Sequence, residues 1–209
     1  MNAELTDKEN KDVAIQAGMQ LIPYVGGSMA TLYFGKKQEK RFKRIETFYE
    51  ELAKEVESMK DSISPIENQD PVFFEAILES LHDKIEEEPT NEKREFFKNY
   101  FKNTLKSPVT TNYDERKYFL EALADMSLLE CEILAFLRSQ KDRVQVSTIQ
   151  KPEIDQYAIV GAIGRLKSRG FVSAAQARIA IGGNADNSLQ ELVAVTQFGE
   201  SFCRFCLSV

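Results

Sequence analysis

The chain has 209 residues, of which 43% are hydrophobic and 29% charged, enough to bury a core in one large or two small domains. Its formal net charge of -6 excludes a protein that coats nucleic acid or anionic lipid over its whole surface, because both partners need broad positive potential. Three cysteines and a polar start predict free thiols in a reducing cytoplasm.

The first predicted element is a helix that opens with a capping box at Thr6 and Glu9 and ends at Pro23. The glycine pair Gly26-Gly27 then favours a turn or a sharp kink. Gly26 and Ala30 form a small-x-x-x-small pair that lets helices approach closely. The preferred interpretation is a helical hairpin buried in the protein.

Residues 13–35 carry no charge and are long enough to cross a bilayer. The cations that follow would form its positive flank, and they include Lys36, Lys37, Lys40 and Arg41. A backbone broken at Pro23 and at the glycine pair would leave polar groups unsatisfied in lipid, which argues against a span. A membrane-surface or oligomer-forming segment remains the alternative to the buried hairpin.

Residues 29–123 are predicted to form helices joined by short polar connections. Apolar residues at three- and four-residue steps indicate a long helix from about 29 to 62, and its apolar stripe requires a partner. Further helices are expected after the Asp70-Pro71 start, after Thr90 or Asn91, and around 118–123. The sequence therefore predicts an acidic α-helical domain over residues 1–123, expected to mediate homo-oligomerisation through the long helix.

Local signals divide residues 124–209 into shorter elements. The expected elements are a helix capped by Ser127 and Glu130, a strand near 144, a helix capped by Asp155 and ended by Gly170, a β-hairpin around the turn "GGNADN", and a last helix capped by Thr196. The predicted fold class is thus mainly α, with helical hairpins or a bundle followed by a small α+β domain.

The segments "GAIGRLKSRGFV" (161–172) and "LVAVTQFGESFCRFC" (192–206) carry a resemblance. Within residues 126–209 they resemble the recognition helix, wing strands and threonine-x-x-glycine helix start of the winged helix-turn-helix domain of bacterial regulators. The start "IPYVGG" with its basic helix is similar to a loose group of bacterial proteins that pair a helical region with such a domain. The resemblance implies a winged-helix domain over 124–209 and no particular activity.

If this domain binds DNA, the resemblance places the contacts on one helix and on the hairpin. The candidates are Gln156, Arg165, Lys167, Arg169 and Arg178. The helix half that usually reads bases is "QYAIVGAIG", which is apolar and small, and winged domains also serve as protein-docking modules. Double-stranded DNA and a protein partner therefore both stay open. DNA would be favoured if Arg165 and Arg169 lie on the same open face as Gln156 and not in salt bridges with the acidic helical domain.

No catalytic chemistry is supported by the residue pattern. His82 is the single histidine and lies near no nucleophile motif, so a surface histidine is expected. The run Glu86 to Glu88 is interpreted as a solvated helix end, and Cys203 and Cys206 as packed small side chains, which leaves no metal site and no cofactor. The sequence predicts a cytoplasmic, non-enzymatic regulatory or adaptor protein; the alternative is a membrane-active effector of defence or toxin type using residues 13–35.

Overall fold

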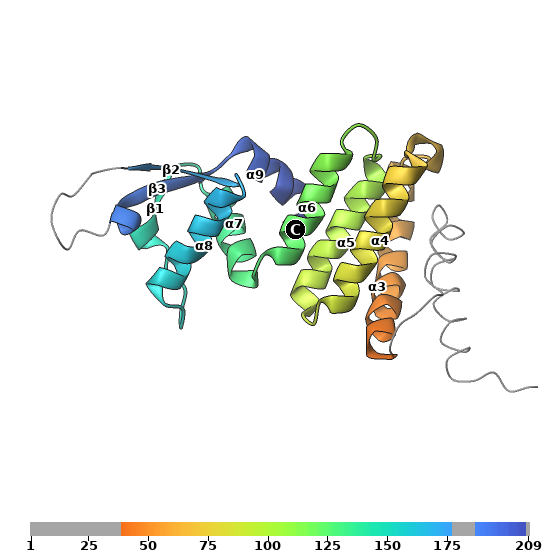
Figure 1. The fold of residues 1–209 in the computed structure, drawn as a ribbon, viewed down its shortest axis with the longest axis horizontal. Helices are drawn as coiled ribbons and strands as arrows, with labels where there is room; N and C mark the ends of the chain where they lie inside the picture. The colour runs from red at the N-terminus through yellow and green to blue at the C-terminus, as the bar shows by residue number, and fades with distance from the viewer. Residues whose placement is uncertain (1–38, 177–186, 208–209) are drawn as a thin grey trace, which may run out of the picture. The chain divides into compact units, whose positions relative to one another are not determined.

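The computed structural model describes residues 39–176 and 187–207. It confirms the predicted fold class, since the described residues form mostly helices with one small antiparallel sheet (Figure 1). The chain divides into two compact units between Glu121 and Ala122, two residues before the boundary predicted from sequence. No helix in the described ranges has the length and apolar character to cross a membrane.

Several predicted residues fall outside the described ranges. They are Pro23, Gly26, Gly27, Ala30, Lys36, Lys37 and Arg178. Lys40 and Arg41 lie in the first turn of the first described helix, α3. The membrane hypothesis for residues 13–35 therefore stays a prediction.

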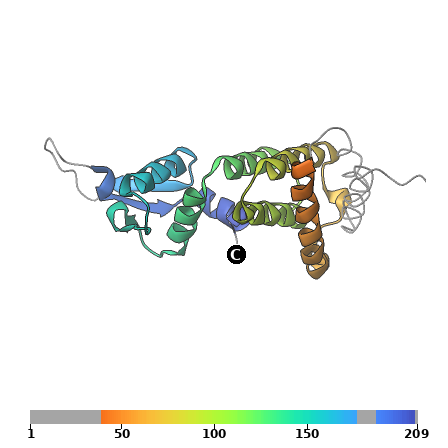
Figure 2. The same cartoon turned by 90° about the horizontal axis from the view of Figure 1, so that it is seen from below.

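The N-terminal unit is built from helices. They are α3 (Glu39–Ser58), α4 (Pro71–Glu87), α5 (Asn91–Lys106) and α6 (Tyr113–Asp125), whose last turn passes into the next unit. α3, α4 and α5 pack side by side (Figure 1, Figure 2). The described part of the apolar stripe of α3 is buried, with Ile45, Leu52 and Val56 inaccessible to solvent. The partner that this stripe requires is therefore supplied by α4 and α5 of the same unit.

The helix starts of this unit follow local rules. Asp70 accepts hydrogen bonds from the amides of Val72 and Phe73, at 3.0 and 3.1 Å, and Pro71 occupies the first helical position, as predicted. α3 ends at Ser58, four residues before the predicted end, and passes into short 3-10 turns at Lys60–Ser62 and Ile66–Asn68.

Two interpretations of α4 are wrong. His82 is 5% exposed and shares a hydrogen bond with the Tyr49 hydroxyl, so it is not a surface histidine. Glu86 is also buried, and Glu88 accepts hydrogen bonds from Thr90 and pairs with Lys93, so the acidic run is not simply a solvated end. His82 and Glu86 are one turn apart, on the same side of the helix as its apolar residues.

The C-terminal unit combines helices with a three-stranded sheet. Its elements are α7 (Leu128–Ser139), β1 (Val144–Gln145), a 3-10 turn (Val146–Thr148), α8 (Gln156–Ser168), β2 (Val172–Gln176), a second 3-10 turn (Asn187–Gln190), β3 (Glu191–Val195), α9 (Gln197–Phe202) and a π-helical turn (Cys203–Leu207). The strand order is β1-β3-β2 and both pairs are antiparallel, with Val172 opposite Val195 and Val144 opposite Val193. α7 packs on α8 and on β3.

The predicted start and end of α8 are both present. Asp155 accepts a hydrogen bond of 2.7 Å from the Tyr157 amide at the start. At the other end Gly170 has φ 77°, which a residue with a side chain rarely adopts. Its amide donates to the Lys167 carbonyl and the Phe171 amide donates to the Leu166 carbonyl, the two bonds of a Schellman motif. α8 is thereby held at both ends.

The cysteines are buried in this unit. Cys131, Cys203 and Cys206 are reduced, and each is at most 1% exposed. Burial raises the pKa of the Cys203 thiol to about 12, so this side chain stays protonated and unreactive at neutral pH.

Candidate functional site

The structure places four of the predicted contact residues on α8 or directly after it, and each has a partner within the C-terminal unit. The Gln156 side-chain amide donates to the Val146 carbonyl at 3.0 Å. Lys167 Nζ lies 2.6 Å from Glu191 Oε2 on β3. Arg165 and Arg169 both reach Glu130 on α7, as described next. The structure thus brings these four side chains together, but each already forms a hydrogen bond or an ion pair within the C-terminal unit.

Glu130 is the carboxylate that organises this site. Its Oε1 accepts from Arg165 Nε at 3.0 Å and from an Arg169 terminal nitrogen at 3.3 Å. Its Oε2 accepts from the Ser127 amide and hydroxyl at 2.7 and 2.8 Å, which completes the predicted capping box. One residue therefore caps α7 and also anchors α8. The sequence indicated only the first of these roles.

The electrostatics of Glu130 follow from these contacts. Burial by itself would raise the pKa of this carboxyl group. The hydrogen bonds from Ser127 and the guanidinium of Arg165 outweigh burial, and the pKa lies below its usual range. Glu130 is therefore ionised at neutral pH. Arg165 and Arg169 share this one carboxylate, while Lys167 pairs with Glu191.

The outward side of α8 has a different character. We call this surface the α8 face, and its exposed residues are Tyr157, Ala158, Gly161, Gly164, Arg165 and Ser168. Tyr157 is 59% exposed and the Arg165 side chain 55%. A methyl group added at Gly164 would meet nothing within 4 Å, and one at Gly161 would meet only Arg165, at 3.8 Å. Packing among the described residues therefore does not require either glycine.

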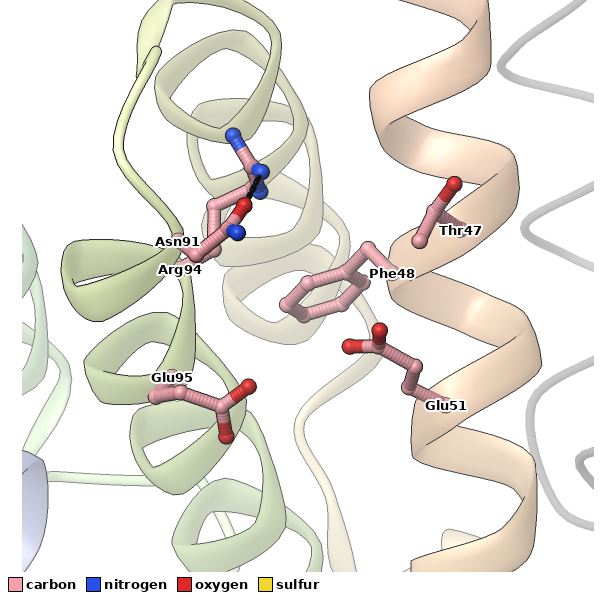
Figure 3. Close-up of a pocket in the computed structure, with 6 residues that line it drawn as sticks. All are labelled: Thr47, Phe48, Glu51, Asn91, Arg94 and Glu95. Atoms are coloured by element: carbon pink, nitrogen blue, oxygen red, sulfur yellow. Dashed lines mark hydrogen bonds between the residues drawn. The ribbon is translucent and has the colours of Figure 1, made fainter.

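A second candidate is a groove of about 220 Å³ between α3 and α5 (Figure 3). It is lined by Thr47, Phe48, Glu51, Asn91, Arg94 and Glu95. Figure 3 shows the Phe48 ring between the two helices, with Glu51 and Glu95 on opposite sides of the groove. Arg94 is held by the Asn91 side chain and by the Glu88 carbonyl.

The carboxylates of this groove serve a buried lysine. Lys98 is 5% exposed in its side chain and lies 2.9 Å from Glu51, 2.7 Å from Glu95 and 3.4 Å from Glu55. Burial alone would lower the Lys98 pKa, but the hydrogen bonds to Glu95 and Glu51 outweigh it and the pKa is raised. These ion pairs make the groove a polar seam that joins α3 to α5.

We expect Lys98→Met to lower the free energy of unfolding by about 2 kcal/mol at neutral pH, because three carboxylates lose the buried cation that they share. The control is Lys117→Met, since Lys117 is half exposed and 3.9 Å from Glu121, and its loss should change stability by less than about 0.5 kcal/mol. Urea unfolding measures both. Equal stability of the two variants would contradict the assignment of Lys98 as the centre of this seam.

Comparison of the sequence with protein families, curated proteins and solved structures finds no match. The arguments for function therefore rest on the geometry of the described residues.

Proposed function

We propose that this chain is a non-enzymatic regulatory or adaptor protein, whose C-terminal unit is a winged helix that docks on protein. The order α7, β1, α8, β2, β3 supports this assignment, with β1 paired to β3 and α8 in the position of a recognition helix. The observation that carries the proposal is the ion pairing of the α8 cations and the uncharged character of its exposed surface. Its cations are engaged by Glu130 and Glu191, while most of its exposed residues are uncharged.

Protein docking is favoured over DNA binding for an electrostatic reason. Affinity for duplex DNA comes mainly from cations that neutralise phosphates and release counterions. Glu130 and Glu191 already pair with Arg165, Arg169 and Lys167, the cations on and directly after α8. Breaking these ion pairs to reach phosphate would leave the buried Glu130 without its counter-ions.

Double-stranded DNA is the second candidate, and one observation favours it. The Arg165 side chain is half exposed and contacts Glu130 through Nε. With respect to residues 39–176 and 187–207, its two terminal nitrogens are available for a phosphate.

A DNA titration of the full-length protein across a salt series distinguishes the two candidates. We expect weak binding whose logarithm falls with the logarithm of salt concentration at a slope of about -1, equivalent to one phosphate contact. Arg165→Ala should remove this residual affinity, while Ser168→Ala should leave it unchanged. A slope several times steeper, with loss of tight binding in an Arg165→Ala, Arg169→Ala double variant, would overturn the protein-docking proposal.

The membrane-effector hypothesis has a separate test, because residues 13–35 lie outside the described ranges. Flotation of the full chain with anionic vesicles, compared with a chain lacking residues 1–35, measures the contribution of that segment. Flotation that depends on the segment would support the effector hypothesis, and flotation unchanged by the deletion would contradict it.

A further inference from the structure

The groove between α3 and α5 has two chemically different ends (Figure 3). Thr47 and Asn91 line the first end, and the carboxylates of Glu51 and Glu95 line the second. Thr47 precedes Glu51 by four residues on α3, and Asn91 precedes Glu95 by four residues on α5. At 1.5 Å per residue the two ends are about 6 Å apart along the helix axes. One small ligand can therefore reach both.

The positive charge of the first end comes from Arg94. Its terminal nitrogens donate to the Glu88 carbonyl at 3.0 Å and to the Asn91 side chain, and both acceptors are uncharged. Within residues 39–176 and 187–207, Arg94 forms no ion pair with a carboxylate. A guanidinium group carries five N–H donors, so with respect to these residues three remain for an anion. Its two hydrogen bonds hold the guanidinium group in place without neutralising it, which suits the recognition of a carboxylate.

The second end favours a cation. Glu51 contacts Lys98 through Oε2 and Glu95 contacts it through Oε1, so the other oxygen of each carboxylate is available with respect to the described ranges. Both glutamate side chains are about half exposed, which leaves these oxygens open to a ligand. Glu55 also pairs with Lys98 and with Lys102, so in this part of the described structure three carboxylates meet two ammonium groups.

An apolar floor separates the two ends. Figure 3 shows the Phe48 ring between them, and this ring offers no hydrogen-bonding group. Phe48 is 2% exposed, so it closes the floor of the groove. The groove volume of about 220 Å³ is below the roughly 300–1,000 Å³ of sites for drug-sized ligands. The matching ligand is therefore small, with opposite charges joined by a short apolar segment.

We propose that this groove binds a small zwitterion of the ω-amino acid class, with its carboxylate at Arg94 and its ammonium group between Glu51 and Glu95. An α-amino acid carries both charged groups on the same carbon, too close together to reach both ends at once. A short polymethylene chain separates them by the distance that the groove requires. The bound molecule would contact α3 and α5 together. This site lies in the N-terminal unit and goes beyond the proposed function, which concerns the C-terminal unit.

A titration of the full-length wild-type protein, followed by ligand-observed NMR at neutral pH and fixed ionic strength, tests the two-ended site. The probes are δ-aminovalerate, valerate and n-pentylammonium, which share one chain length and carry both charges, the negative charge alone and the positive charge alone. We expect δ-aminovalerate to bind at least about tenfold more tightly than either other probe, because each of these lacks the charge-assisted hydrogen bonds of one end. If δ-aminovalerate binds no better than the other two, the proposal is overturned.

Glycine tests the spacing of the two charges. It carries the same ammonium and carboxylate groups as δ-aminovalerate, but on a single carbon. We expect glycine to bind at least about tenfold more weakly than δ-aminovalerate, since it can engage only one end of the groove. Equal affinity for the two zwitterions would contradict the distance of about 6 Å on which the choice of ligand depends.

Variants at each end assign the contacts. Arg94→Met should reduce the affinity for δ-aminovalerate to that of n-pentylammonium and leave n-pentylammonium binding unchanged. Glu95→Gln should reduce it toward that of valerate and leave valerate binding unchanged. The matched control is Lys117→Met, at a half-exposed lysine that does not line the groove, which should bind every probe as the wild type does. A loss of affinity for all probes alike in Arg94→Met and Glu95→Gln would indicate altered packing of the helices and would contradict the assignment.

Discussion

Replacing Gly199 with alanine is expected to lower the free energy of unfolding of the C-terminal unit by about 3 kcal/mol or more. A methyl group at this position would lie 2.2 Å from the Phe171 carbonyl oxygen and 2.9 Å from a Val195 methyl group. The backbone of Phe171 has little room to move, because its carbonyl accepts from the Thr196 amide and its amide donates to Leu166. Urea unfolding measured on the C-terminal unit gives the size of the loss.

The matched control is Gly164→Ala, at a glycine whose surroundings are open. Alanine is the better helix former by about 1 kcal/mol, so this variant should be more stable than the wild type. We therefore expect Gly199→Ala to lower the free energy of unfolding and Gly164→Ala to raise it. Similar effects from both would show that the close approach at Gly199 does not limit stability.

This contact explains the threonine-x-x-glycine pattern on which part of the winged-helix resemblance rests. Thr196 accepts from the Gly199 amide at 2.9 Å and donates its hydroxyl proton to the Gly170 carbonyl at 2.6 Å. Threonine thus joins the start of α9 to the end of α8, and glycine lets the backbone of Phe171 pass close by. Both residues serve the packing of the unit and neither needs a ligand.

Most helix caps, which depend on neighbouring residues, were predictable from sequence, although the Thr90 side chain makes no capping hydrogen bond. The caps at Asp70, Ser127, Asp155 and Thr196 all formed as predicted, because a cap satisfies amides only two or three residues away. Gly170 was predictable for the same reason. The fold class follows from these local signals together with the apolar periodicity of the helices.

Features that depend on distant residues were missed. His82 binds Tyr49 across 33 positions of the chain, Arg165 binds Glu130 across 35 and Lys98 binds Glu51 across 47. Periodicity tells which side of a helix is apolar but not which polar group a neighbouring helix presents there. The cations of α8 are visible in the sequence, while the pairing of Arg165 and Arg169 with Glu130 needed the structure.

Glu130→Ala is expected to lower the free energy of unfolding of the C-terminal unit by about 3 kcal/mol at neutral pH. The change removes the capping box at Ser127 and takes away the carboxylate that Arg165 and Arg169 share. Glu130→Gln keeps an acceptor oxygen for the cap, so its free energy of unfolding should fall by less than that of Glu130→Ala. Urea unfolding of the wild type and both variants measures the ranking.

The pH dependence separates the charge of Glu130 from its shape. The folded-state pKa of Glu130 lies below the ordinary value of 4.5, so its ionised form contributes stability above that value, and the contribution is lost as pH falls through the folded-state pKa. The stability difference between the wild type and Glu130→Gln should therefore shrink in acid. Glu55 and Glu88, whose pKa values are also lowered, titrate in both proteins, so their contributions cancel in the stability difference.

The control is Glu132→Gln, at an exposed carboxylate paired with Lys151. Its free energy of unfolding should differ little from that of the wild type at any pH. A Glu130→Gln difference that stays constant in acid would mean that the arginines of α8 are held by packing and not by this ion pair.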